Sequence, residues 1–311
     1  MSLVIASSEN ISPSAASGDW QVRPLNGRIG AQIQGLHLSG SLNAATVLAL
    51  RQALNTYKVL FFRGQQHLDN TEHEAFGRLW GEIEAHPTVP APDGSTLFEL
   101  DSSKGARADA WHTDVTFQAA PPKVCVLRAV ELPPYGGDTL WANAVTGYQY
   151  LPAPLKILAE GLRAIHANDH DYAEARLSPQ ASNNEVQSRD AYRKVFRRRH
   201  IEAEHPVVHL HQETGEKSLL LGNFVKRFKG LNSSESASVL QLLHERLLHP
   251  QNTVRWQWQP GDIAVWDNHA TAHIATNDYG DVRRVVRRVT VTGHKLIGLD
   301  GRLSEQIADE N

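Results

Sequence analysis

The sequence contains a single cysteine, Cys125, and lacks any run of apolar residues long enough to cross a bilayer. One cysteine excludes an intrachain disulfide and a cysteine-rich zinc site, and it favours a reducing, cytoplasmic location. The charge is nearly balanced, with 31 basic and 34 acidic residues and a formal net charge of −3. This balance predicts neither a nucleic-acid partner nor a membrane partner.

Residues 1–19 lack the basic segment and the long apolar core of a signal peptide, so none is predicted. Their serine and alanine content predicts a mobile tail. Residues 20–311 contain no internal repeat and no linker, which predicts one large domain with room for a core and a pocket. Within it, residues 166–200 are polar, which predicts a surface excursion acting as a lid over a site. A loop without function fits their composition equally well.

The rest of the chain alternates between short strands and a few helices. Helical spacing of apolar residues is found at 42–57, 71–80, 145–162 and 232–248. Pro152 and Pro154 divide the third of these helices into two pieces, and Ser233 or Ser234 is the expected N-cap of the last. Many short strands between Gly/Pro turns predict a mainly β fold with flanking α-helices, a β-sandwich or jelly roll. A doubly wound α/β fold is disfavoured, because no GxGxxG follows the first strand.

The stretch WHTDVTF, residues 111–117, reads as a strand that contains a histidine and an aspartate two positions apart. Side chains at i and i+2 of a strand project to the same face, so His112 and Asp114 are expected to point together. Two histidines and one carboxylate on one face, with open positions left on the metal, are typical of non-haem Fe(II) oxygenases. A bare HxD pair is common in ordinary surface and core positions, so the motif needs further support.

Three later stretches supply that support. GGDTLWAN covers residues 136–143, and WDNHATAH covers 266–273 and ends at a candidate third ligand, His273. RRVVRRV, residues 283–289, places Arg284 and Arg288 on one strand face, where two guanidinium groups can grip an anion. Taken alone, RRVVRRV could be a solvated basic strand and His273 a surface histidine. Their order along the chain, together with the HxD pair, argues for a site.

These motifs, in this order and with an arginine eleven residues after His273, resemble the taurine dioxygenase family of Fe(II)- and 2-oxoglutarate-dependent oxygenases. The resemblance runs from about Trp20 to Gly293. It implies a double-stranded β-helix, which agrees with the jelly-roll prediction, and it makes residues 20–311 a single catalytic oxygenase domain. Members of the family commonly self-associate, so a homo-oligomer is expected.

The resemblance also assigns the site. His112, Asp114 and His273 are the implied iron ligands, and no catalytic group beyond the iron centre is implied. Thr139 and Arg284 would hold the distal carboxylate of 2-oxoglutarate, the cosubstrate. Arg288 would meet the acidic head of the substrate or assist at the cosubstrate.

Several stretches resemble the alkylsulfatase branch of the family, among them HPTVP, LRAVELP, LLLGNFVKRFKG and NTVRWQW. That branch oxidises the carbon next to a sulfate ester oxygen and releases an aldehyde and sulfate, with succinate and CO2 from the cosubstrate. The implied substrate is a small anionic organosulfur compound. By resemblance, His86 contacts the sulfo group, together with Arg288 and the backbone N–H of Val115. Ala108 and Ala110, just before WHTD, suit an alkyl chain better than an ammonium group.

Other functions remain open at this stage. A taurine or other alkyl sulfonate dioxygenase, or an aryloxyalkanoate dioxygenase, would share every iron ligand. A jelly-roll binding module would not need the Arg284 and Thr139 pair, and a zinc hydrolase would need a general base that the sequence does not identify. One departure from the family pattern is His269, where arginine is frequent, and His269 is not predicted to be a ligand.

Overall fold

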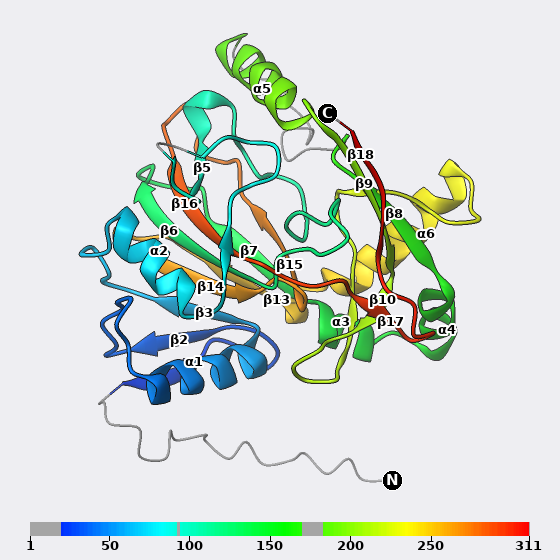
Figure 1. Ribbon diagram of the computed structural model, residues 1–311, viewed down its shortest axis with the longest axis horizontal. Helices are drawn as coiled ribbons and strands as arrows, with labels where there is room; N and C mark the ends of the chain where they lie inside the picture. The colour runs from blue at the N-terminus through cyan, green and yellow to red at the C-terminus, as the bar shows by residue number, and fades with distance from the viewer. Residues whose placement is uncertain (1–19, 92–93, 170–182, 311) are drawn as a thin grey trace.

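A computed structural model describes residues 20–91, 94–169 and 183–310 (Figure 1). The predicted tail at 1–19 and the middle of the predicted lid, residues 170–182, lie outside this part of the chain. Within it, strands form one large sheet and three small ones, and helices lie around them. The prediction of a mainly β fold with flanking helices is confirmed.

The large sheet contains several strands that border the candidate site. Its order is β1 (Gln21–Pro24), β2 (Ala31–Gln34), β3 (Val59–Phe62), β14 (Ile263–Asp267), β6 (Val124–Glu131), β16 (Val285–Val291) and β4 (Ile83–Glu84), and β5 (Phe98–Asp101) also pairs with β16. Only β2 and β3 pair in parallel among the described strand pairs of this sheet, and the others are antiparallel. This pairing rules out a doubly wound parallel sheet.

The small sheets lie beside the large one. They are β13 (Thr253–Trp256), β7 (Thr139–Asn143) and β15 (Thr271–Ala275); β12 (Val225–Phe228), β8 (Arg163–Ala167), β9 (His200–Pro206) and β18 (Glu305–Glu310); and β11 (Lys217–Leu219), β10 (Val208–Leu210) and β17 (Ile297–Gly298). β7 and β15 pair in antiparallel register, with His273 opposite Trp141. The strand that carries His273 therefore lies next to the strand that begins at Thr139.

Two of the helices lie against the large sheet, and two lie beside the small sheets. The helices are α1 (Ala44–Tyr57), α2 (Asn70–Arg78), α3 (Ala144–Gln149), α4 (Ala153–Gly161), α5 (Asn183–Phe196) and α6 (Ser233–Leu247), with short 3-10 turns η2 (Ser102–Lys104) and η4 (Pro250–Asn252). α1 and α2 lie against the large sheet, and α3 and α6 lie beside the small ones (Figure 1). No helix in the described ranges has the length and apolar character needed to cross a membrane.

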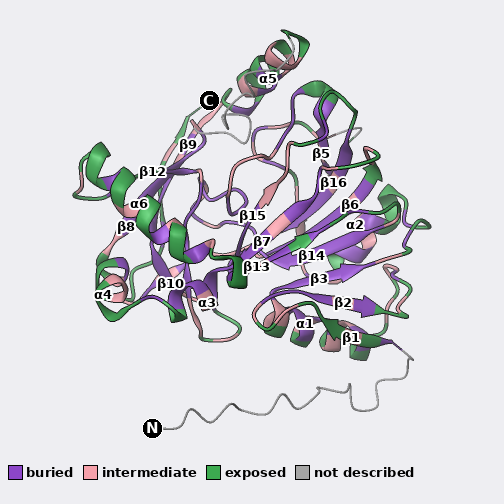
Figure 2. Cartoon of the chain, turned by 180° about the vertical axis from the view of Figure 1, so that it is seen from behind, coloured by how far each residue is buried: buried purple, intermediate pink, exposed green. Residues whose placement is uncertain are grey.

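The centre of the large sheet is buried on both faces, whereas its edge strand β1 is mostly exposed. β3 shows this plainly, because all four of its residues are buried. Val59 and Phe61 join the core that contains Trp141 and Trp266, whereas Leu60 and Phe62 join the core under α1 and α2. Figure 2 shows the same contrast between buried sheet strands and helices with exposed outer faces. The first of these two cores surrounds the site.

The predicted helices are present, with two corrections at their boundaries and in the predicted lid. The predicted division into two helices is confirmed, and the break lies at Pro152, the N-cap of α4, whereas Pro154 is in the first turn of α4. The N-cap of α6 is Asn232 rather than Ser233 or Ser234. Its Oδ1 accepts the N–H of Glu235 at 3.0 Å and Glu235 Oε2 accepts the N–H of Asn232 at 2.9 Å, a reciprocal capping box that needs an acid three residues on. The described end of the predicted surface excursion is the helix α5, not irregular chain.

Candidate metal centre

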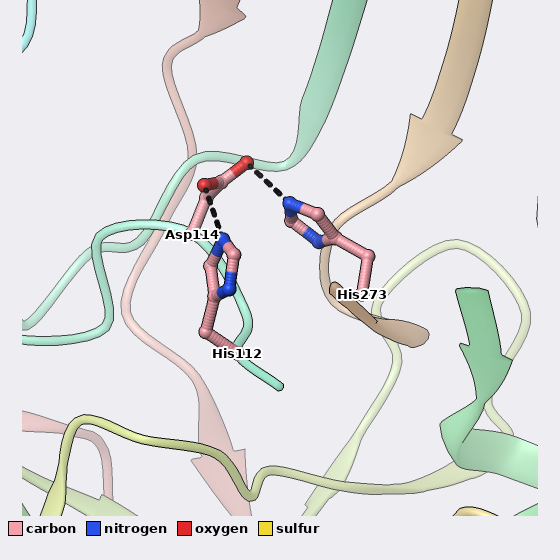
Figure 3. Close-up of side chains that lie close together, drawn as sticks. All are labelled: His112, Asp114 and His273. Carbon is pink, nitrogen blue, oxygen red and sulfur yellow. Dashed lines mark ion pairs between the residues drawn. The ribbon is translucent and has the colours of Figure 1, made fainter. Parts of the chain in front are cut away.

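His112, Asp114 and His273 lie together in the core (Figure 3). His112 Nε2 is 3.5 Å from Asp114 Oδ1, and His273 Nε2 is 3.7 Å from Asp114 Oδ2. All three side chains are buried, and one donor atom from each lies within 4.8 Å of the other two. The structure therefore brings together the three residues that the sequence singled out.

The strand predicted for WHTDVTF is wrong. His112 forms one isolated antiparallel bridge with His273, through N–H···O bonds of 2.9 and 2.7 Å, and residues 114–117 form a turn. Val115 in this turn has φ 56°, in the left-handed region, which costs a β-branched residue about 1 to 3 kcal/mol. The side chains converge because the bridge sets His112 beside His273 and the turn brings Asp114 back, not because of strand alternation.

The protonation states suit metal binding. His112 Nδ1 donates to the carbonyl of Ala110 at 2.7 Å, which orients the ring so that Nε2 is directed at Asp114. Burial lowers the pKa of His273 well below its usual value, and nearby His112 adds to this. Burial would raise the pKa of Asp114, but Arg288 and the two histidines hold it well below its usual value. Two imidazoles and one carboxylate are the donor set that suits Fe(II) with open positions.

A pocket opens beside these residues, and both inward-facing arginines line it. Its wall includes His112, His273, Thr139, Arg284 and Arg288. Arg284 Nε donates to the Gly137 carbonyl at 2.9 Å, and its Nη2 has no partner within the described residues. Burial lowers the pKa of Arg284. A buried guanidinium with a free donor next to a cavity is a ready site for an anion.

Arg283 and Arg287, which alternate with Arg284 and Arg288 along the chain, point to the outer face and form ion pairs there. Arg283 bonds to Asp101 at 2.8 Å, and Arg287 bonds to Glu99 at 2.8 Å. These side chains lie 50% and 26% exposed, whereas Arg284 and Arg288 are buried. The prediction that Arg284 and Arg288 share one face is confirmed.

Arg288 lies between the pocket and the metal ligands. It donates to the Asp114 carboxylate through Nη1 and to Thr290 Oγ1 through Nε at 3.3 Å, and its guanidinium lies 4.8 Å from the centre of the Phe98 ring. Thr139 lines the pocket and accepts a hydrogen bond from Trp258 Nε1 at 2.9 Å.

His86 is buried against Phe98, and its ring stacks on the Phe98 ring at 4.5 Å between centroids. Its Nδ1 accepts the N–H of Val89 at 3.1 Å, so the neutral ring carries its proton on Nε2, which has no partner within the described residues. Burial, then Arg288, lowers its pKa to about 3. His86 and Val115 are not among the residues that line the arginine pocket, but both are part of the core next to it.

Two residues that touch Asp114 were not predicted. The Cys125 thiol donates to Asp114 Oδ2 at 3.3 Å, and the side chain of Asn268 bonds to the backbone of Asp114. The available signal for Asn268 was its place in the WDN motif. His269 was not predicted to be a ligand, and it is not part of the His112–Asp114–His273 group. It is buried and donates through Nε2 to Pro121 O at 2.8 Å.

Comparisons with known proteins agree with this geometry. The family model described as "Taurine catabolism dioxygenase TauD, TfdA family" matches residues 21–290. An alkylsulfatase of Acinetobacter baylyi is 52% identical over 90% of this chain and 87% of its own length. An alpha-ketoglutarate-dependent sulfate ester dioxygenase of Pseudomonas putida is 50% identical over 91% and 93%.

A solved structure shows the same similarity. The crystal structure of a taurine dioxygenase from Burkholderia xenovorans superposes with a TM-score of 0.76 at 36% identity, covering 93% of this chain and 95% of that one. The chain therefore belongs to the taurine catabolism dioxygenase (TauD, TfdA) family, which makes it an oxidoreductase and implies Fe(II) and 2-oxoglutarate as its metal and cosubstrate.

Proposed function

We propose that the protein is an Fe(II)- and 2-oxoglutarate-dependent dioxygenase that hydroxylates the carbon next to the ester oxygen of an alkyl sulfate. The products are an aldehyde and sulfate, with succinate and CO2 from the cosubstrate. The observation that carries the proposal is the buried His112–Asp114–His273 group beside two inward-facing arginines. The proposed substrate class is supported by the 50–52% identity with an alkylsulfatase and a sulfate ester dioxygenase over most of the chain.

In this proposal His112, Asp114 and His273 hold the metal, and no further protein group acts on the reacting atoms. When bound, Fe(II) with 2-oxoglutarate and dioxygen supplies the oxidising power that breaks the substrate C–H bond. The protein's part is to keep the ligands in their binding protonation states, to orient the substrate and to exclude water. The fixed tautomer of His112 and the burial of all three side chains support this role.

Arg284 and Thr139 would bind the distal carboxylate of 2-oxoglutarate. Arg284, whose Nη2 has no hydrogen-bond partner among the described residues, and Thr139 both line the pocket. A carboxylate there would relieve the cost of burying Arg284 without a counter-charge, which is a strong reason for affinity and orientation.

His86, Arg288 and the backbone N–H of Val115 would receive the sulfate group. Arg288 supplies a permanent positive charge. His86 stays neutral at physiological pH and offers its Nε2–H as a donor. A neutral donor beside a guanidinium suits an oxyanion and would not compete with it for charge. Arg288 also touches Asp114 and lines the same pocket as Arg284, so a secondary role at the cosubstrate is part of the proposal.

The pocket wall supports an alkyl chain over an ammonium group. Ala108 lines the pocket, and the charged residues on either side of it, Arg107 and Asp109, both have partners. Asp109 accepts from Arg189 at 2.9 Å, and Arg107 donates to the side chain of Asn277 and to Gly280 O at 2.9 Å. An ammonium group entering this site would find the Asp109 carboxylate already paired with Arg189 through Oδ2, although its buried Oδ1 has no hydrogen-bond partner among the described residues.

The architecture that goes with this function is a double-stranded β-helix, a jelly roll, in one domain from residue 20 onward. Helix α5 is proposed as part of a lid, because its buried Arg189 pairs with Asp109 at the pocket wall and its Phe196 lies 5.5 Å from the His86 ring. Protease cleavage near α5 that substrate and 2-oxoglutarate fail to suppress would argue against a lid. A homo-oligomer and a cytoplasmic location remain predictions.

The test is product formation with Fe(II), ascorbate and 2-oxoglutarate against medium-chain alkyl sulfates, taurine and a phenoxyacetate in parallel. Succinate with equal sulfate and aldehyde from the alkyl sulfates alone is the expected result. Turnover of taurine or the phenoxyacetate alone would keep the oxygenase and overturn the substrate. Sulfate release without 2-oxoglutarate consumption would favour a zinc hydrolase, and ligand binding without turnover a binding module.

A further inference from the structure

The side chain of Asn268 is fully buried and forms hydrogen bonds with the backbone around Asp114. Its Oδ1 accepts the N–H of Asp114 at 2.9 Å, and its Nδ2 donates to the carbonyl of Asp114 at 3.1 Å. Nδ2 also donates to the carbonyl of Pro122 at 2.9 Å. One amide side chain therefore holds both polar backbone groups of a candidate ligand that lies 154 residues away.

Asn268 is itself held firmly. It follows β14 directly, and its own N–H donates to Lys123 O at 2.9 Å. The preceding carbonyl, of Asp267, accepts the hydroxyl of Thr271 at 2.7 Å and the N–H of Ala270 at 3.2 Å. This short connection leads into β15, which carries His273. The same connection thus fixes one candidate ligand through the strand and a second through the amide of Asn268.

The turn that Asn268 holds contains an energetically unfavourable backbone conformation. Val115, the next residue after Asp114, is β-branched and has φ 56°. Such a conformation persists only where the surrounding contacts impose it. Cys125 and Arg288 contact the carboxylate of Asp114, and Asn268 bonds to its backbone N–H and carbonyl.

We propose that Asn268 is a positioning residue that fixes the direction of the Asp114 carboxylate and thereby sets the affinity and geometry of metal binding. The proposal rests on the metal site of the proposed function. Partners behind metal ligands commonly contribute 10- to 100-fold to metal affinity, roughly the size expected here.

The experiment compares Co(II) binding to the metal-free full-length protein and its variants, by calorimetric titration and by the visible absorption spectrum. Asn268→Ala removes all three bonds. Asn268→Asp keeps the size and the acceptor, but loses the donor to two carbonyls. The matched control is Asn252→Ala, because Asn252 is buried and donates in the same way to Asn143 O at 2.8 Å and Leu247 O at 2.7 Å.

Both Asn268 variants are expected to bind Co(II) about 10- to 100-fold more weakly and with a changed spectrum. Asn252→Ala should lower the melting temperature by a similar amount and leave the Co(II) affinity within about twofold. If the unmodified protein binds no Co(II), the proposed metal centre fails, and the proposed function fails with it. If it binds and the Asn268 variants match it, or if neither variant folds while Asn252→Ala does, Asn268 is only structural and the inference is overturned.

Discussion

Arg284 offers the sharpest separation of ligand binding from stability. Its guanidinium is buried, bonds to Gly137 O at 2.9 Å through Nε, and leaves Nη2 without a partner in the described part of the chain. Arg284→Met keeps a similar length and apolar stem and removes the charge. Because the removed guanidinium is buried and forms no ion pair with a carboxylate of the described residues, the ligand-free protein should lose no more than about 1 kcal/mol of unfolding free energy.

Affinity for 2-oxoglutarate should change far more. Removing one partner of a buried, hydrogen-bonded charge pair costs about 2 to 5 kcal/mol. Each ~1.4 kcal/mol corresponds to a factor of ten, so the dissociation constant for 2-oxoglutarate should increase by a factor between roughly 30 and several thousand. Anaerobic calorimetric titration of the Fe(II)-loaded protein with 2-oxoglutarate measures it directly, and denaturant unfolding of the unloaded protein measures stability.

Arg283→Met is the matched control, because the neighbouring side chain is half exposed and pairs with Asp101 on the outer face. Exposed ion pairs contribute about 0 to 1 kcal/mol, so this variant should bind 2-oxoglutarate as the parent does. The reasoning would be refuted by an Arg284→Met protein that keeps its 2-oxoglutarate affinity within threefold. A loss shared equally by Arg283→Met would refute it too.

Three other outcomes are expected. His112→Ala and Asp114→Ala should each abolish turnover and metal binding while the circular dichroism spectrum is kept, and residual turnover would contradict the site. Arg288→Ala should raise KM for alkyl sulfates more than it weakens 2-oxoglutarate, and an equal loss would place Arg288 at the cosubstrate. Burial, with smaller effects from neighbouring groups, lowers the pKa of His73 and of His269 to about 3, so below pH 6.5 the unfolded chain takes up their protons first. Stability measured by urea unfolding should therefore fall on acidification, by about 1.4 kcal/mol per pH unit for each such histidine, and a flat profile from pH 7 to 5 would contradict this.

The candidate ligands could be identified from the sequence because their types and order are specific, but their local structure could not. His112 and Asp114 were placed on a strand, and the structure has a bridge followed by a turn. The partner that decides this geometry is Asn268, 154 residues away. Local propensity carries no information about such a contact, so the right residues were predicted to converge for the wrong structural reason.

Helix α5 was missed for a related reason. It is strongly polar, and its buried residues are Arg189, Tyr192 and Phe196. Arg189 is buried because it pairs with Asp109, far away in the sequence, and with Glu185 one turn earlier at 3.0 Å. An apolar stripe is the usual signal for a packed helix. When the buried face of a helix is formed around an ion pair, its polar composition predicts an irregular surface segment instead of a packed helix.

The register of β16 links the fold to the site. RRVVRRV reads nearly the same after a shift of one residue, so the motif does not itself decide which arginines face inward. The following residues decide it. Val289 and Val291 belong to the core under α2, and a Cβ on Gly77 of that helix would lie only 2.4 Å from Val289 Cγ1. This close packing fixes the odd-numbered residues toward α2, so the even-numbered Arg284 and Arg288 must point to the metal side.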